Sequence, residues 1–100
     1  MDFTQPLSTG FTVYSKSGCI MCSKVKNLLK EKSIFFQVID CDDYLIEDKE
    51  GFLSFMESCV GSSKPQRSFP IVFYDAKFIG GFQETNEFVQ KLLLQFEEMF

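Results

Sequence analysis

The sequence contains no histidine and no tryptophan among its 100 residues. Without histidine, and with only one Cys-x-x-Cys pair, a zinc site lacks the further ligands that it would need at suitable spacing. No apolar run approaches the ~20 residues that span a bilayer, so we expect no membrane partner. The net charge is −4 and no cluster of Lys and Arg is present, which argues against a nucleic-acid partner.

The first residues also lack the features of a secretion signal. The stretch from Met1 to Pro6 is acidic and polar, with neither a basic region nor an apolar core. Four cysteines in a chain without such a signal are typical of a reducing compartment, where a Cys-x-x-Cys pair serves chemistry more often than cross-linking. We therefore expect a cytoplasmic protein.

The length predicts one domain over residues 1–100, with residues 1–10 as a short N-terminal leader. Thirteen phenylalanines indicate a core built largely from Phe, and Phe3 and Leu7 suggest that one helical turn of the leader docks on it. Hydrophobic periodicity predicts the order β-α-β-α-β-β-α, an α/β or α+β arrangement of three or more helices around a four-stranded mixed sheet. The expected strands are residues 11–15, 34–40, 71–74 and 77–79, and the expected helices are residues 19–32, 46–60 and 84 or 85 to the end.

Three details of this arrangement are specific enough to test. The strand at residues 34–40 is so apolar that we expect it to be buried on both faces, as parallel strands are. The acidic residues 40–43 are expected to form a turn, and residues 61–68 a loop. Asp75 and Ala76 are expected to form the turn of a hairpin.

Two cysteines, Cys19 and Cys22, stand where the first strand gives way to the first helix. The unpaired N–H groups and the dipole at a helix N-terminus stabilise a thiolate, which lowers a thiol pKa from about 8.5 to roughly 3.5–7.5. Lys16 adds a cation nearby. Cys19 should be exposed and Cys22 one turn further in, so we interpret Cys19 as the attacking thiolate and Cys22 as the resolving thiol.

Other interpretations of the pair remain open. A purely structural disulfide would close a very short loop and stabilise the chain little. The two cysteines could also ligate a metal or a cluster, or stand close together incidentally. Of the two remaining cysteines, Cys59 lies on an apolar helical stripe and is interpreted as a core residue, and Cys41 as an unreactive thiol beside three aspartates.

Three motifs together resemble the glutaredoxins of the thioredoxin superfamily over nearly all of residues 11–100. They are Cys19-Ile20-Met21-Cys22 after the first strand, Ser68-Phe69-Pro70 before the third, and Gly80-Gly81 after the fourth. The resemblance implies a thioredoxin-like fold. It also implies a glutathione-disulfide oxidoreductase of the dithiol type, acting on glutathionylated or disulfide-containing proteins and monomeric unless a cluster bridges two copies.

The resemblance further implies a glutathione groove. Lys16 would meet the glycyl carboxylate, and Pro70 would be a cis-proline. Phe69 would pair through its backbone with the cysteinyl part. Arg67 matches a position near the same ligand that is often basic or polar, and Gly81, Phe82 and Gln83 match the stretch that binds the γ-glutamyl carboxylate.

The active-site motif departs from the commonest dithiol pattern, because Ile20 and Met21 stand where that pattern has proline and an aromatic residue. Glutaredoxins without this proline are more often similar to cluster binders. The sequence therefore leaves open a dimer in which Cys19 and glutathione hold a [2Fe–2S] cluster. It also leaves open a dithiol redox domain that does not depend on glutathione, or a redox-inactive interaction domain, since residues 82–84 differ from the family's usual pattern.

Overall fold

The strands form one four-stranded mixed sheet in the order β2-β1-β3-β4, which confirms the predicted sheet. The chain is represented by a computed structural model that describes residues 2–61 and 68–99, with side chains as far as residue 95. β1 is parallel to β2 and antiparallel to β3, and β3 is antiparallel to β4. The strands are β1 (Phe11–Ser15), β2 (Phe36–Asp40), β3 (Ile71–Tyr74) and β4 (Lys77–Gly80).

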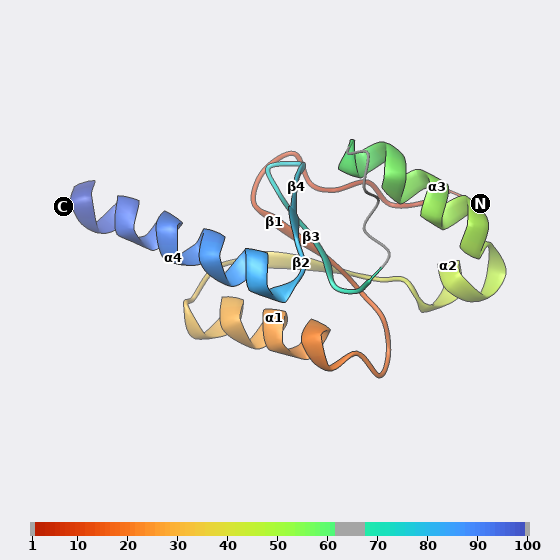
Figure 1. Cartoon of the computed structure of the whole chain (residues 1–100), viewed down its shortest axis with the longest axis horizontal. Helices are drawn as coiled ribbons and strands as arrows, with labels where there is room; N and C mark the ends of the chain where they lie inside the picture. The colour runs from red at the N-terminus through yellow and green to blue at the C-terminus, as the bar shows by residue number, and fades with distance from the viewer. Residues whose placement is uncertain (1, 62–67, 100) are drawn as a thin grey trace.

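Helices cover both faces of this sheet (Figure 1). One face carries α1 and α4, and the other carries α2 and α3. The helices are α1 (Ile20–Glu31), α2 (Asp42–Glu47), α3 (Lys49–Val60) and α4 (Phe82–Met99). Within the described part of the chain, none of these helices combines the length and apolarity that crossing a membrane would require.

Alternation along β1 divides the core into two clusters. Phe11 and Val13 face α1 and α4, where they pack with Val25, Leu29 and Val89. Successive side chains of a strand point to opposite faces, so Tyr14 enters the other cluster. That cluster contains Phe52 and Met56 of α3, and burying an apolar side chain of this size contributes roughly 1.5–3 kcal/mol. The expected Phe-rich core is present on both faces.

The N-terminal leader is part of the second cluster. The ring of Phe3 lies edge-on to Tyr44 and Phe52, with centroids 5.0 and 5.6 Å away. The backbone carbonyl of Thr4 accepts a 2.7 Å hydrogen bond from the Tyr14 hydroxyl. Burial is the main cause that raises the pKa of that hydroxyl, followed by the nearby Cys59 and Cys41. The described leader contains no helix, so the expected helical turn is absent although Phe3 docks as anticipated.

The second strand was predicted wrongly as buried on both faces. β2 is an edge strand and leaves Gln37, Val38 and Asp40 exposed, with only Ile39 fully in the core. Its apolar residues are divided between the two faces of the sheet: Ile39 packs in the cluster with α3, and Phe36 packs against the cluster with α1 and α4.

The segment after β2 also differs from the prediction. Asp40 ends the strand, and Asp42 and Asp43 begin α2 instead of forming a turn, since carboxylates are favourable in the first turn of a helix. The single helix expected at residues 46–60 is two helices. The helical conformation is interrupted at Asp48, whose backbone dihedrals are not helical. The Asp48 carboxylate accepts a 3.1 Å hydrogen bond from the Gly51 N–H and so caps the start of α3.

The hairpin turn at Asp75 and Ala76 is confirmed, with both residues at positive φ (51° and 65°). This is the backbone geometry of a two-residue hairpin whose twist matches that of the strands. The closing helix begins at Phe82, two residues before the expected start, so Phe82 and Gln83 are helical. The expected loop falls mostly on residues 62–67, which lie outside the described residues.

Candidate active site

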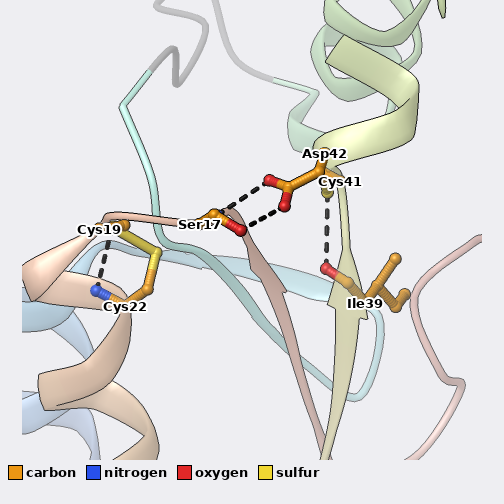
Figure 2. Close-up of a disulfide and its surroundings, with 6 residues drawn as sticks. All are labelled: Ser17, Cys19, Cys22, Ile39, Cys41 and Asp42. Atoms are coloured by element: carbon orange, nitrogen blue, oxygen red, sulfur yellow. Dashed lines mark hydrogen bonds between the residues drawn. A yellow bond between two sulfur atoms is a disulfide. The ribbon is translucent and has the colours of Figure 1, made fainter. Parts of the chain in front are cut away.

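Cys19 and Cys22 are joined as a disulfide at the beginning of α1, with Cα atoms 5.2 Å apart (Figure 2). Cys19 is the N-cap residue of the helix, with an extended backbone, and its Sγ accepts a hydrogen bond from the Cys22 N–H at 3.1 Å. The sulfur therefore takes the place that a Ser or Asp oxygen usually takes at a helix start. This position is the one that the sequence predicted for a stabilised thiolate.

The two sulfurs differ in their access to solvent. Cys22 is 1% exposed and belongs to the buried face of α1, whereas Cys19 is half-buried. The two residues between them point outward, with Ile20 73% and Met21 44% exposed. Cys19 is therefore accessible from solvent and Cys22 is not, and two apolar side chains flank the accessible sulfur.

Two features fix the loop that leads into Cys19. Gly18 has φ +70°, a left-handed backbone conformation that favours glycine, although a Cβ there would meet nothing within 4 Å. Ser17 donates its backbone N–H to Asp42 Oδ1 at 2.9 Å and its hydroxyl to Asp42 Oδ2 (Figure 2). These bonds lower the pKa of Asp42, with a smaller contribution from the charge of Lys16. The start of α2 thus holds the active-site loop.

Lys16 and Phe69, which the sequence assigned to a glutathione groove, do meet. The Lys16 Nζ lies 5.5 Å from the centre of the Phe69 ring, within the range of a cation–π contact. The Phe69–Pro70 peptide bond is cis, as expected, and Pro70 is buried. Both Lys16 and Phe69 line a groove of about 340 Å³ whose other described lining residues are Leu45, Lys49 and Leu53.

Cys19 itself lines a second hollow of about 340 Å³. Lys16 lines it too, together with Cys19 and Ile20. Lys26, half-buried on α1, adds a second cation to the same hollow. Two lysines thus line the hollow that Cys19 lines, although the whole chain carries a net charge of −4.

The stretch from Gly81 to Gln83 leads into α4, which begins at Phe82 rather than at the expected residue 84 or 85. Gly81 precedes α4, and its N–H donates a 2.8 Å hydrogen bond to Glu84 Oε1. Glu84 is the third residue of the helix, so this is the reach-back contact of a capping box. Phe82 is half-buried and packs against the core cluster that contains Phe11 and Val13. The Lys24 Nζ lies over its ring, 5.8 Å from the ring centre. Gln83 is exposed.

The two remaining cysteines are free thiols away from solvent, Cys41 buried and Cys59 half-buried. Cys41 is fully buried, its Sγ donates a 3.5 Å hydrogen bond to the Ile39 carbonyl, and its pKa is raised to about 12. Burial is the main cause, and Asp40 and Asp42 add to it. This supports the interpretation of Cys41 as an unreactive thiol, with burial rather than aspartate charge as the main reason. Cys59 packs on the α3 cluster as predicted, and burial raises its pKa.

Sequence reasoning missed four residues of this site, and Arg67, which it did assign, lies outside the described residues. The missed residues are Asp42, Leu45, Lys49 and Leu53. All four come from α2 and α3, well after the cysteines in the chain, and no local pattern links them to the active site. Among residues 2–61 and 68–99, no group of three or more acidic or cysteine side chains is placed to hold a metal ion.

The sheet order and the disulfide at the N-terminus of α1 define a thioredoxin-like redox protein. Comparison with known proteins narrows this class further. The family model for glutaredoxin matches residues 11–79, so the chain belongs to the glutaredoxin family, with the Cys19–Cys22 pair in the family's active-site position.

Individual relatives agree with this assignment. Glutaredoxin-C6 of Oryza sativa subsp. japonica is 35% identical over 78 residues, which are 78% of this chain and 64% of that protein. The chain thus matches less than two thirds of the length of this relative. Glutaredoxin 1 from Francisella tularensis, solved in complex with cacodylate, has a TM-score of 0.71 and 29% identity over 83% of this chain and 94% of that one. A buckwheat glutaredoxin–glutathione complex has a TM-score of 0.66 and 28% identity, covering 84% and 71% of the two chains.

Proposed function

We propose that this chain is a glutathione-dependent thiol–disulfide oxidoreductase in which Cys19 is the nucleophile and Cys22 the resolving thiol. The observation that carries the proposal is the place of Cys19 Sγ at the N-cap of α1, 3.1 Å from the Cys22 N–H. A thiolate there gains a hydrogen bond and the favourable end of the helix dipole, so it forms at lower pH than an ordinary thiol. Membership of the glutaredoxin family supports glutathione as the reductant.

On a glutathione mixed disulfide, the Cys19 thiolate attacks the glutathione sulfur. A bond forms between this sulfur and Cys19 Sγ, the original disulfide breaks, and the partner leaves as a thiolate that takes a proton from water. A second glutathione thiolate then attacks the glutathione sulfur held on Cys19. The bond between this sulfur and Cys19 Sγ breaks, glutathione disulfide leaves, and Cys19 is again a thiolate. The two electrons that reduced the mixed disulfide thus come from glutathione.

On a protein disulfide, the Cys19 thiolate attacks one sulfur and the other leaves as a thiol after protonation. Cys22 loses its proton and attacks Cys19 Sγ, which releases the second protein thiol and forms the Cys19–Cys22 disulfide found in the structure. Two glutathione molecules then reduce this disulfide and become glutathione disulfide. The burial of Cys22 suits this role, because the sulfur within its reach is Cys19 Sγ and not the sulfur of an incoming substrate.

Glutathione would lie along the groove beside Cys19. We propose that the ammonium of Lys16 meets its glycyl carboxylate and that Phe69, before Pro70, offers its backbone to the cysteinyl part. At the far end we propose that the γ-glutamyl group lies against Gly81, Phe82 and Gln83 at the start of α4, where its carboxylate would compete with Glu84 Oε1 for the Gly81 N–H. The contribution of Arg67, the monomeric state, the protein partners and the cytoplasmic location stay predictions.

Serine substitutions test the two roles separately. Cys19→Ser should abolish reduction of a glutathionylated peptide, whereas Cys22→Ser should retain it and lose most reduction of a protein disulfide. Cys59→Ser, half-buried and away from the pair, is the matched control and should behave as the wild type. Turnover by Cys19→Ser at the wild-type rate would refute the assignment, and equal loss in both active-site variants with both substrates would refute the division of roles.

A further inference from the structure

The sheet has an open edge at β2, on the same side of the molecule as the hollow that Cys19 lines. Among the described strands, only β1 pairs with β2. The Cys41 N–H, just after β2, donates a 2.8 Å hydrogen bond to the Ser15 carbonyl of β1. Because the backbone groups of successive residues point to alternate sides of a strand, the N–H and C=O of Val38 point away from β1, toward the open side.

Two hollows connect this edge to the reactive cysteine. The hollow of about 340 Å³ that Cys19 lines and a smaller one of about 150 Å³ that Val38 lines share three lining residues, Lys16, Ser17 and Lys26. Their other described walls come from α1, β1 and β2, whereas the groove beside Phe69 is lined from α2 and α3. A continuous surface therefore leads from Cys19 to the edge of β2, separate from the groove in which we place glutathione.

Positive charge is concentrated along this surface. Residues 16–32 contain five lysines and one acidic residue, although the whole chain has a net charge of −4. Lys26 is half-buried in the wall of both hollows, and Lys30 follows one helical turn later on the same side of α1. Asp40 also lines the smaller hollow, but its carboxylate accepts a 2.9 Å hydrogen bond from the Asp42 N–H. The surface therefore favours a ligand with acidic side chains.

The edge also exposes apolar side chains. Val38 is 40% exposed, and Phe35, immediately before the strand, is 79% exposed. An extended peptide can pair with such an edge through its backbone, while its alternate side chains contact the surface beside it. A second copy of the chain fits less well. Antiparallel pairing of two β2 strands would place the lysines of both α1 helices on the same face of the joined sheet, where they would repel each other.

We propose that the open edge of β2 binds an extended acidic segment of the protein substrate. The segment would pair with β2 as a further strand, with acidic side chains near Lys26 and Lys30 and apolar ones near Val38. It would belong to the partner whose thiolate leaves when Cys19 attacks the glutathione sulfur of the mixed disulfide. The proposal rests on the proposed function, because it names the class of protein that is reduced at the same sulfur.

The first test compares two glutathionylated peptides of equal length, with either Glu or Lys at alternate positions beside the cysteine. At low ionic strength, kcat/KM should be about three- to tenfold higher for the acidic peptide, because attraction to the lysines replaces repulsion. Lys26→Gln should lower this ratio at least about twofold, and Lys26→Arg should retain it. The ratio is taken within each variant, so any change in the reactivity of Cys19 cancels. Lys77→Gln, exposed on β4 at the opposite edge of the sheet, is the matched control and should keep the wild-type ratio.

The second test probes strand pairing without altering the protein. Two further versions of the acidic peptide are N-methylated, each at one of the two sets of alternate residues. A strand directs only every second N–H toward its neighbour, so one set should lower kcat/KM about fivefold, the effect of one lost hydrogen bond. The other set should change kcat/KM less than about twofold.

The failures are distinct from one another. Equal rates on the acidic and basic peptides, or a preference that Lys26→Gln leaves intact, would overturn the recognition of acidic segments. Equal effects of the two methylation patterns would overturn strand pairing with β2, and so would a dimer in sedimentation that Val38→Lys dissociates. In each of these cases turnover of the peptides leaves the proposed function standing. If the wild type turns over none of the glutathionylated peptides, the proposed function fails and the inference falls with it.

Discussion

Gly18 offers a test of how the loop before Cys19 positions the sulfur. Its φ of +70° costs an L-residue roughly 1–2 kcal/mol, and an added Cβ would meet nothing within 4 Å, so no clash adds to that cost. Alanine also lowers the conformational entropy of the unfolded chain, and this offsets about 0.4–1 kcal/mol of that cost. Gly18→Ala should therefore lower the free energy of unfolding by about 0.5–1 kcal/mol, or Tm by roughly 2–8 °C for a domain of this size.

The same substitution should also affect the chemistry. If the loop relaxes toward negative φ, the backbone enters Cys19 differently and Sγ loses its 3.1 Å contact with the Cys22 N–H. A hydrogen bond worth about 1 kcal/mol to the thiolate corresponds to about a fivefold change in thiolate population. We therefore expect the reduced variant to react with iodoacetamide at Cys19 several-fold more slowly than the wild type at neutral pH.

Gly10→Ala is the matched control for this experiment. Gly10 has φ +80° and the same free space, but it lies before β1, away from the cysteines. It should lose similar stability in urea unfolding and leave the alkylation rate of Cys19 unchanged. Unaltered stability of Gly18→Ala, or equal slowing of Cys19 alkylation in both variants, would refute the reasoning.

Three other predictions concern charge, buried polarity and metal binding. Asp42→Asn should be less stable than the wild type at neutral pH. The pKa of Asp42 in the folded protein is below its ordinary value of 3.8, so the ionised carboxylate stabilises the fold at pH values above 3.8. The urea midpoints of the two proteins should converge as the pH falls through the lowered pKa, and a difference that stays constant with pH would contradict this. Thr85→Val should raise stability by about 1–2 kcal/mol, since the buried Thr85 hydroxyl has no hydrogen-bond partner among the described residues. Thr12→Val, which removes the acceptor of the 3.0 Å bond from the Leu7 N–H, should lower stability, and the same sign for both variants in thermal unfolding would argue against the account. Anaerobic reconstitution with iron, sulfide and glutathione should leave the protein colourless, and visible absorbance that requires Cys19 would favour a cluster-binding role instead.

The sequence predicted what depends on local pattern. β1 and β3 were recognised from β-branched and aromatic residues, and the first helix from its spacing of apolar residues, so the place of Cys19 at the strand–helix junction followed directly. The hairpin turn at Asp75 and Ala76 was also recognised between two apolar runs. In each case, the residues that decide the structure are neighbours in the chain.

The errors concern features that depend on tertiary arrangement. Burial of β2 required knowing that it lies at the edge of the sheet, which the strand itself does not encode. Asp42 belongs to an acidic run that resembles a turn, and its bond to Ser17 joins residues 25 positions apart. Lys49 lines the groove only because α3 packs over the same face as Phe69. A longer-range signal than periodicity is needed to find such residues.

The pKa of Cys19 is the most direct measure of the proposed mechanism. It can be obtained from the pH dependence of iodoacetamide alkylation of the reduced protein, with peptide mass spectrometry separating Cys19 from Cys22, Cys41 and Cys59. The N-cap position and the neighbouring lysines predict a midpoint clearly below the ordinary thiol value of about 8.5, with Cys19 modified first. A midpoint at or above that value, or protection of Cys19 from alkylation in the folded protein, would contradict the account.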